Sequence, residues 1–373
     1  MKIKTITCHD VYNYGASLQA LALQTFLQQN SHEVEVIDYK PSYIDFYYKI
    51  SPFVNPLSPV KKCTDKSAVF RFMYATKRFL WSLPSLKRKA AFDKFTKRYL
   101  MMTRKYSSND ALSQCVPAAD TYVVGSDQVW NSVTMLNGSD PAFYLQFAPH
   151  DKKRISYAAS FGALTISDAY QGDIIEWLKS LDAISVREST GVDILNNIGL
   201  SGVQVCDPVF LLSQDQWRRL LNIEASNQKY ILIYNLTSVN PKLLSDAKYL
   251  AQKMNLPLYS VSPMKIEGVD KNLCSVGPEE FVSLIFNSAF VLTNSFHATA
   301  FSIIARRQFC TYNYHSKGNS SRMHSVLEEM QLLDRLNVND IQSLYNTPID
   351  YSRINDIIEG SCENGRKWLI NNI

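Results

Sequence analysis

The chain has 373 residues, more than a single hydrophobic core usually serves, so we expect two domains. A hydrophobic content of 46% suits globular folding, and the sequence contains no apolar run of about 18 residues that would predict a membrane span. The net charge of +5 is local, because residues 61–105 hold 14 basic and 2 acidic side chains whereas the rest of the chain is acidic overall.

Cysteine usage indicates a reducing environment. The seven cysteines are scattered and form no Cys-x-x-Cys pair, which argues against a disulfide framework and against a zinc site. Residues 1–8 are too short and too polar for a secretory signal, and they predict a first strand instead. We therefore expect a cytoplasmic protein with reduced thiols.

The first forty residues predict a strand, a loop, a helix and a second strand. Residues 2–8 and 33–39 alternate between apolar and polar side chains, and residues 18–27 form an apolar helix. The loop contains Asn13 and Gly15, and a glycine before a helix lets the backbone approach a ligand closely. Loops at the carboxyl ends of strands bind ligands in open α/β sheets. A simple turn is the commoner role for such a glycine.

Residues 40–105 differ from the rest of the first half. Aromatic and proline residues come first, and a basic segment with interleaved aromatic side chains follows. This pattern predicts helices inserted into the first domain. Their basic side is either simply solvated or contacts an anionic lipid or a lipid-phosphate-linked acceptor. We do not expect nucleic acid as a partner, because no recognised binding motif accompanies the charge.

Four further segments predict strands that alternate with helices, which is typical of a parallel, doubly wound sheet. They are residues 120–124, 154–162, 182–187 and 203–206. Ser126 and Asp127 follow the first of them, and Arg187 lies at the end of the third. Trp130 is either a stacking surface for a sugar ring or, more commonly, a buried core residue.

The alternation resumes after a polar junction that ends near residue 228. Strands are predicted at 230–235, 257–261, 290–293 and 308–313, and helices at about 240–254 and from Pro278. Residues 317–322 predict a polar basic loop before a helix over 323–330. We therefore expect two domains, residues 1–212 and 229–373, and leave open whether the last helix packs back on the first domain.

A histidine occupies the start of one predicted helix. Thr293, Asn294 and Ser295 suit a helix cap, and His297 follows in the first turn. Free N–H groups at such an end attract phosphate or carboxylate groups. Taken alone, this histidine more often packs or bonds locally.

Seven motifs occur in order along the chain. They are Asn13-Tyr-Gly15, Gly125-Ser-Asp-Gln-Val-Trp-Asn131, Ser156-Tyr-Ala-Ala-Ser-Phe-Gly162, Ser185-Val-Arg-Glu-Ser189, Asp207-Pro-Val209, Thr293-Asn-Ser-Phe-His297 and Ser321-Arg322. Together they resemble the polysaccharide pyruvyl transferase family over about residues 5–330. The resemblance implies two Rossmann-like domains facing a cleft, as in GT-B glycosyltransferases. It also implies transfer from phosphoenolpyruvate to a sugar diol of a cell-surface polysaccharide precursor, giving a pyruvate ketal without a metal or another cofactor.

The resemblance also suggests roles for individual residues. His297 is the predicted general acid/base, because an imidazole titrates near neutrality. Arg187 is expected to bind the donor phosphate or carboxylate, with a surface pair to Glu188 as the alternative. Asp127 could accept a proton from a sugar hydroxyl or hydrogen-bond the sugar, or it could cap a following helix.

The remaining predicted contacts are to substrate. Asn13, Gly15 and Ser126 are expected to face the cleft, and no metal ligands are predicted. Much of the family carries an arginine two residues before the motif histidine, where this chain has Ser295. Ser295 stays a predicted substrate contact without the arginine's role. Lys317 and Arg322 could replace that arginine, or they could belong to a solvated loop.

Two other functions fit the sequence. A GT-B-type glycosyltransferase or sugar-nucleotide enzyme would use the same cleft, since one fold hosts many reactions. A non-catalytic component of a polysaccharide-assembly complex is the second alternative. In each case we expect a cytoplasmic protein, with peripheral contact at the inner face of the membrane through residues 61–105 and a sugar partner that could be lipid-linked.

Overall fold

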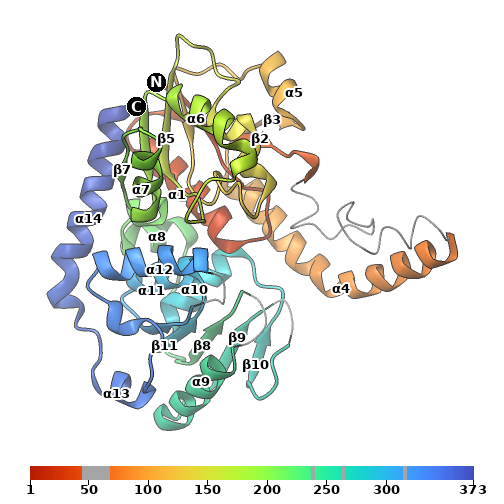
Figure 1. Ribbon diagram of the computed structural model, residues 1–373. Helices are drawn as coiled ribbons and strands as arrows, with labels where there is room; N and C mark the ends of the chain where they lie inside the picture. The colour runs from red at the N-terminus through yellow and green to blue at the C-terminus, as the bar shows by residue number, and fades with distance from the viewer. Residues whose placement is uncertain (44–67, 237–239, 263–264, 314–316) are drawn as a thin grey trace.

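The computed structural model describes residues 1–43, 68–236, 240–262, 265–313 and 317–373, without the side chains of residues 68, 70–72, 74–85 and 317–320. Two α/β units are stacked one above the other (Figure 1). Each is built around a parallel sheet with helices packed against it. The predicted fold class, two Rossmann-like units, is therefore confirmed.

The first sheet has seven parallel strands in the order β3-β2-β1-β4-β5-β6-β7. Their bounds are β1 Lys2–Ile6, β2 Glu33–Tyr39, β3 Met102–Tyr106, β4 Thr121–Val124, β5 Lys153–Ala159, β6 Ala183–Val186 and β7 Val203–Gln204. The strand order reverses between β1 and β4, which is the position where doubly wound sheets bind ligands at their carboxyl edge.

Helices connect these strands. The α-helices are α1 Tyr14–Gln29, α4 Ala68–Tyr99, α5 Asn109–Gln114, α6 Gln171–Lys179 and α7 Ser189–Asn197. Short 3-10 helices are η1 Leu136–Ser139, η2 Pro141–Tyr144, η3 Asp168–Tyr170 and η4 Pro208–Leu211. Helix α1 is buried along most of its length, because it lies between the first sheet and the second unit.

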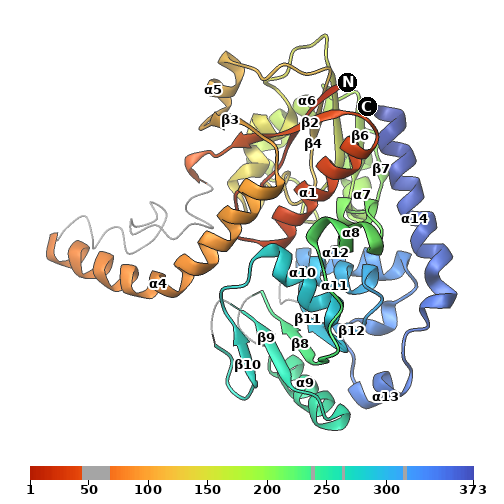
Figure 2. The ribbon, with the colours of Figure 1, turned by 180° about the vertical axis from the view of Figure 1, so that it is seen from behind.

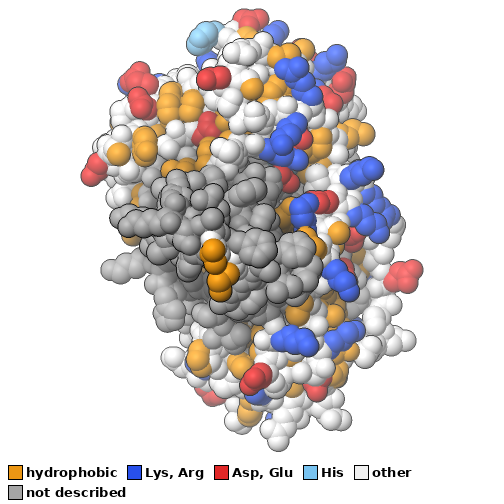
Figure 3. Space-filling view, turned by 90° about the vertical axis from the view of Figure 1, so that its right-hand side faces the viewer, with side chains coloured by type: hydrophobic (Ala, Val, Ile, Leu, Met, Phe, Trp, Pro, Cys, Tyr) orange, Lys and Arg blue, Asp and Glu red, His pale blue; other side chains and the backbone are white. Residues whose placement is uncertain are grey.

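The described part of the basic segment contains one long helix, α4, and residues 44–67 of the predicted helical insertion lie outside the described residues. Its end packs on the first unit through the buried Phe92 and Phe95, while its beginning projects from the body (Figures 1 and 2). The predicted insertion also ends early, since residues 102–106 form the edge strand β3. Lys and Arg side chains gather along one side of the face from which α4 projects (Figure 3). Residues 61–67 of the proposed membrane contact lie outside the described residues.

The second sheet has five parallel strands in the order β10-β9-β8-β11-β12. Their bounds are β8 Ile231–Tyr234, β9 Leu258–Val261, β10 Lys271–Leu273, β11 Phe290–Thr293 and β12 Gln308–Thr311. The connecting helices are α9 Pro241–Met254, α10 Pro278–Asn287 and α11 Phe296–Ile304, and α8 Gln214–Leu221 lies in the junction between the units. The order reverses between β8 and β11, so α11 begins at the expected ligand position of this sheet.

Four elements follow the second sheet: α12 Lys317–Glu329, η5 Leu333–Arg335, α13 Ile341–Asn346 and α14 Tyr351–Asn372. The prediction of a loop over 317–322 is wrong, because α12 begins at Lys317. Its apolar side chains, from Met323 to Met330, recur at helical spacing and are buried. Their packing outweighs the poor helix propensity of the polar residues before them.

Helix α14 returns from the second unit to the first (Figure 1). Nε of Arg366 donates to the carbonyl of Leu211 at 3.0 Å, and the ring of Trp368 lies 6.2 Å from that of Tyr157 in β5. None of the described helices is both long enough and apolar enough to cross a membrane.

The contact between the two units is apolar and closely packed. Tyr14 of α1 stacks on Phe281 of α10 with ring centres 4.2 Å apart, and its hydroxyl donates to the carbonyl of Val276 at 3.0 Å. One cluster of buried apolar side chains runs through both units. Such an interface restrains relative motion of the domains.

Candidate active site

The predicted site residues come from the ends of strands in both units. Arg187 directly follows β6, and Asp207 comes after β7 and caps the start of η4. His297 lies in the first turn of α11, in the other unit. Arg187 and His297 lie at strand ends, as predicted, and both lie beside the same buried carboxylate.

That carboxylate belongs to Asp207, whose side chain is fully buried. Its Oδ2 lies 2.8 Å from Nη1 of Arg187 and 3.6 Å from Nε2 of His297. Its Oδ1 accepts the N–H of Val209 at 3.1 Å. Burial alone would raise the pKa of Asp207, but His297 and Arg187 outweigh it and lower that pKa well below the ordinary range. Asp207 is therefore a fixed anion.

Arg187 is a buried cation with carboxylates around it. Beyond Asp207, its Nη2 lies 3.8 Å from Oδ1 of Asp127 and its Nε lies 3.8 Å from Oε2 of Glu188. Burial alone would lower the pKa of Arg187, but these three carboxylates raise it. Nε and Nη2 are buried and make no hydrogen bond with the described residues. The alternative of a surface pair with Glu188 is wrong, because the Arg187 side chain is 1% exposed.

His297 is held between the two units. A Cβ added to Gly15 would lie only 1.8 Å from Nδ1 of His297, so this glycine provides the space for the imidazole. The prediction that Gly15 admits a ligand is therefore corrected, since its close neighbour is a side chain of the second unit. The imidazole also packs edge-on against Phe296 with ring centres 5.1 Å apart.

Two helix caps fix the backbone on either side of this contact. Oδ1 of Asn13 accepts the N–H of Gly15 at 2.9 Å at the start of α1. Oγ of Ser295 accepts the N–H of Ala298 at 3.4 Å at the start of α11. Ser295, which stands where much of the family has an arginine, thus serves as a helix cap. Its oxygen is used by the cap, so its hydroxyl proton is what it can offer to a ligand.

Arg322 lies beside this cluster, on α12. With the Gln128 amide oriented so that its oxygen faces the guanidinium, that oxygen accepts from Nη1 at 3.0 Å and from Nη2 at 2.8 Å. Burial, followed by the neighbouring Arg187, lowers the pKa of Arg322 to about 10. The structure therefore brings Arg322 to the predicted site, whereas the side chain of Lys317 lies outside the described residues.

In the Gly-Ser-Asp turn after β4, Ser126 is buried and Asp127 is partly exposed. Ser126 is fully buried and donates to the carbonyl of Ala158 at 2.7 Å, with Oδ2 of Asp207 at 3.2 Å. Ser126 therefore supports Asp207 and does not face the cleft as predicted. Asp127 has a side chain that is 17% exposed, against 0% for Asp207, so it is the carboxylate more open to a substrate.

Two alternatives from the sequence are settled by position. No helix follows Asp127 directly, so it does not cap one; its Oδ1 accepts the N–H of Gln128 at 2.9 Å. Trp130 is fully buried and donates from Nε1 to the carbonyl of Phe143 at 2.8 Å. It is a core residue and not a stacking surface.

Sequence reasoning missed three members of the cluster, namely Asp207, Glu188 and Gln128, although each lies inside a motif noted above. Asp207 carried the clearest signal, because an aspartate followed by a proline just after a predicted strand places a carboxylate at the edge of the sheet. Glu188 accepts a hydrogen bond from Ser160 Oγ at 2.8 Å. No signal in the sequence distinguished Glu188 or Gln128 from surface residues.

The assembled cluster suits anion binding and proton transfer. Two guanidinium groups lie near each other, and a histidine with a carboxylate partner lies beside them. Among the described residues, no group of three or more His, Cys, Asp or Glu side chains is arranged to hold a metal ion.

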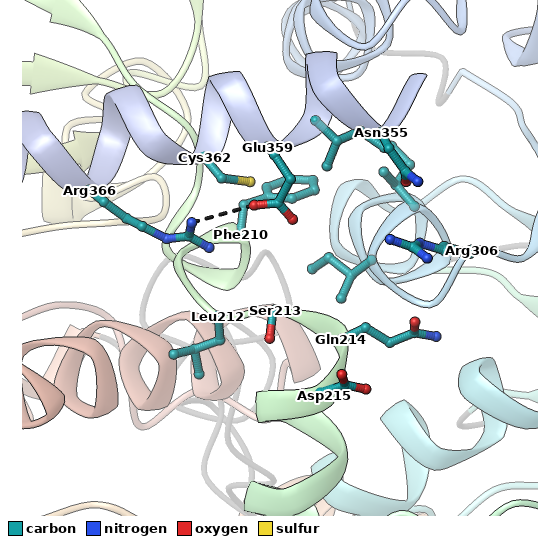
Figure 4. A pocket seen from close by; sticks show the side chains of 13 residues that line it. Phe210, Leu212, Ser213, Gln214, Asp215, Arg306, Asn355, Glu359, Cys362 and Arg366 are labelled. Atoms are coloured by element: carbon teal, nitrogen blue, oxygen red, sulfur yellow. Dashed lines mark ion pairs between the residues drawn. The ribbon is translucent and has the colours of Figure 1, made fainter. Parts of the chain in front are cut away.

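A separate cavity of about 270 Å³ lies between α14, α8 and α11. Figure 4 shows Arg366 and Glu359 of α14 at its edge, paired at 3.5 Å, with Arg306 and Gln214 facing them. None of the predicted site residues lines this cavity, so its size alone does not make it the active site.

Comparison with known proteins supports the fold and gives the family. Three solved structures resemble this chain: UDP-GlcNAc 2-epimerase from Neisseria meningitidis bound to UDP-GlcNAc, the S. aureus MnaA–UDP co-structure, and an alpha-glucosyltransferase in complex with UDP and DNA. Each has a TM-score of 0.51, with identities of 11%, 14% and 10%. The matches cover 100%, 99% and 100% of this chain and 99%, 95% and 96% of the others. At these identities the likeness shows the fold, which is GT-B-like as predicted.

Comparison with curated protein sequences gives no significant match. A protein family does match, however, over residues 13–316, and it is described as polysaccharide pyruvyl transferase. That range includes every strand-end residue of the cluster, from Asp127 to His297, and ends just before α12. This chain therefore belongs to the polysaccharide pyruvyl transferase family.

Proposed function

We propose that this protein transfers the enolpyruvyl-derived group of phosphoenolpyruvate to two hydroxyls of a sugar in a polysaccharide precursor, forming a pyruvate ketal. The observation that carries the proposal is the meeting of His297, Asp207 and Arg187 from two units, in a member of this family. The reaction needs a site for a phosphate and a carboxylate, a proton donor, and a group that accepts hydroxyl protons.

Arg187 and Arg322 are the proposed donor-binding residues. An anion between two neighbouring guanidinium groups relieves their mutual repulsion, and guanidinium groups bind phosphate and carboxylate in a bidentate manner. Nε and Nη2 of Arg187, which make no hydrogen bond within the described part of the chain, supply hydrogen-bond donors. Arg322 takes the part of the family arginine that Ser295 replaces, and Ser295 can donate its hydroxyl proton to the same anion.

His297 is the proposed proton donor to the methylene carbon of phosphoenolpyruvate. Protonation there makes C2 oxocarbenium-like, and the first sugar hydroxyl adds to C2 with loss of its proton. Phosphate then leaves, and the second hydroxyl closes the ketal with loss of a second proton. The carboxylate of Asp207, 3.6 Å from Nε2, would hold the imidazole in position for this transfer.

Asp127 is the proposed acceptor of a hydroxyl proton from the sugar. Its carboxylate is the more exposed of those described around Arg187, because Glu188 and Asp207 are at most 1% exposed. Its position 3.8 Å from Arg187 places it beside the proposed donor site. A sugar hydroxyl between Asp127 and the donor carbon would be oriented for addition.

The test is incubation with phosphoenolpyruvate and a panel of nucleotide-linked, lipid-linked and polymeric sugars. Phosphate release together with a mass gain on the sugar is the expected result. His297→Asn should reduce turnover about 10²–10⁴-fold, the usual contribution of a general acid or base. His324→Asn is the matched control, because that side chain is 54% exposed and pairs only with Glu328 among the described ion pairs. Near-normal turnover in His297→Asn would rule out the assignment.

A sugar-nucleotide reaction is the second candidate, because the similar epimerase structure from N. meningitidis is bound to UDP-GlcNAc. A thermal-shift comparison separates the two proposals. Stabilisation by UDP-sugars and none by phosphoenolpyruvate would favour the second candidate. Membrane recruitment through α4 without any turnover would instead favour a non-catalytic role in polysaccharide assembly.

A further inference from the structure

A small cavity of about 170 Å³ lies between the two units, apart from the charged cluster. The first unit contributes the loop before α1 and one arginine of α4, and the second unit contributes the ends of β8 and β9. The lining residues are Tyr12, Asn13, Tyr14, Arg88, Tyr234, Asn235, Leu236, Val261 and Ser262. Its volume suits a small group and is below the ~300 Å³ at which sites for drug-sized ligands begin.

Arg88 is held in this cavity as an oriented cation. Its guanidinium carbon lies 5.3 Å from the ring centre of Tyr14 and 5.2 Å from that of Phe92. Nη2 donates to the carbonyl of Tyr12 at 2.7 Å. These contacts fix the plane of the group before any ligand arrives, which lowers the entropic cost of binding.

The charge of the cavity favours an anion. Among the described residues that line it, Arg88 is a cation and none carries a carboxylate. The other polar groups are tyrosine hydroxyls, asparagine amides and a serine hydroxyl, which are the partners that sugars use. Tyr12 is only partly buried, and its ring adds apolar surface of the kind on which sugar rings pack, whereas Tyr14 and Tyr234 are 2% and 4% exposed and pack on Phe281.

His297 does not line the cavity, but two segments that do line it are linked to the surroundings of this histidine. Asn13 and Tyr14 precede Gly15, whose backbone lies against the imidazole of His297. On the other side, the N–H of Leu236 donates to Oδ1 of Asn294 at 2.9 Å, just before α11. A ligand in this cavity would therefore contact the residues that precede Gly15 and a residue bonded to Asn294.

We propose that this cavity binds the acceptor as a glycosyl phosphate, with its phosphate on Arg88 and its sugar against Tyr12 and Asn13. The proposal rests on the proposed function for calling this ligand the acceptor. The donor occupies the separate cluster around Arg187. Arg88 thus makes a phosphorylated acceptor bind better than the same sugar without phosphate.

Calorimetric titration with a panel of hexose 1-phosphates and the corresponding free hexoses tests the proposal without turnover. Arg88→Gln should weaken binding of the best hexose 1-phosphate by about tenfold or more, since hydrogen bonds to charged groups are worth about 1.5–3 kcal/mol. Affinity for phosphoenolpyruvate and for the free hexose should not change. Arg88→Lys should fall between wild type and Arg88→Gln.

Arg98→Gln is the matched control, because it removes the same charge from the same helix at an exposed position outside the cavity. Equal weakening in both variants, or unchanged binding in Arg88→Gln at an unchanged melting temperature, overturns the proposal. A UDP-hexose and a short-chain prenyl diphosphate hexose distinguish the two sources of such a phosphate. Loss of affinity for either one on Arg88→Gln supports the site and identifies the source.

The outcome is separable from that of the proposed function. Arg88-dependent binding without phosphate release from phosphoenolpyruvate would keep this site and reject pyruvyl transfer. Phosphate release with a free or neutral polymeric sugar, unaffected by Arg88→Gln, would keep pyruvyl transfer and reject this site.

Discussion

Replacing Gly15 with alanine tests whether the first unit holds His297 in its working position. The added Cβ would lie 1.8 Å from Nδ1 and 2.3 Å from Cγ of the imidazole, and Cβ atoms essentially never make contacts below 3.0 Å. Because the overlap reaches Cγ, close to the root of the side chain, a small rotation of the ring does not remove it. The imidazole must leave its place beside Asp207.

The expected loss of activity follows from the role proposed for that imidazole. General acid–base catalysis contributes about 10²–10⁴-fold, which corresponds to about 3–5 kcal/mol of activation free energy. We therefore expect Gly15→Ala to lower kcat within this range. Its effect on the melting temperature should be smaller than that of a core substitution, since alanine favours a helix over glycine by about 1 kcal/mol and offsets part of the clash.

The assay is phosphate release from phosphoenolpyruvate, with thermal unfolding measured on the same samples. Gly360→Ala on α14 is the control, because its added Cβ would meet nothing within 4 Å. A Gly15→Ala, His297→Ala double variant should be no slower than His297→Ala alone, because the vacated space accepts the methyl group. Wild-type turnover in Gly15→Ala, or losses that multiply in the double variant, would refute the reasoning.

Two further predictions concern stability. Asp207→Asn should lower the free energy of unfolding by about 3 kcal/mol in chemical denaturation, because it removes the closest buried partner of Arg187. Because the pKa of Asp207 is lower in the folded protein, its carboxylate stabilises the fold above the unfolded pKa of about 4, and this stabilisation is lost as the pH falls further. The difference in free energy of unfolding between wild type and Asp207→Asn should therefore be constant from pH 7 to about pH 5 and shrink below about pH 4. A difference that grows on acidification would contradict this. Gly365→Ala should cost about 1–3 kcal/mol, because its Cβ would lie 2.7 Å from Sγ of Cys206, whereas Gly360→Ala on the same helix should not destabilise; equal melting temperatures would show that α14 does not pack as described.

The parts of this fold that could be predicted are those with strong local patterns. Apolar strands such as 121–124 and 290–293 were predicted close to their observed bounds. The short edge strands β3 and β10 were not, because their five and three residues carry little burial pattern. Helix α12 was predicted too short, since tertiary packing of its apolar face overrides the weak propensity of its first turn.

The sequence allowed individual site residues to be predicted, but not which of them contact one another. Arg187 and His297 were identified because each lies at the end of a strand or the start of a helix. Their meeting at Asp207 depends on how two units pack, and local periodicity carries no information about that packing. The same limit explains Gly15, which was correctly taken as a site of close approach but assigned to a ligand, when its neighbour comes from a residue 282 positions later in the chain.

The proposed catalytic histidine belongs to one half of the chain, and its surroundings belong to the other. Gly15 and Asp207 precede the junction between the units, and His297 follows it. A chimera that joined the first half of one relative to the second half of another would set a native histidine in foreign surroundings, even with both halves correctly folded. The residues at positions 15, 207 and 297 must therefore be compatible with one another, and exchanging one domain preserves the site only when the three residues still fit together.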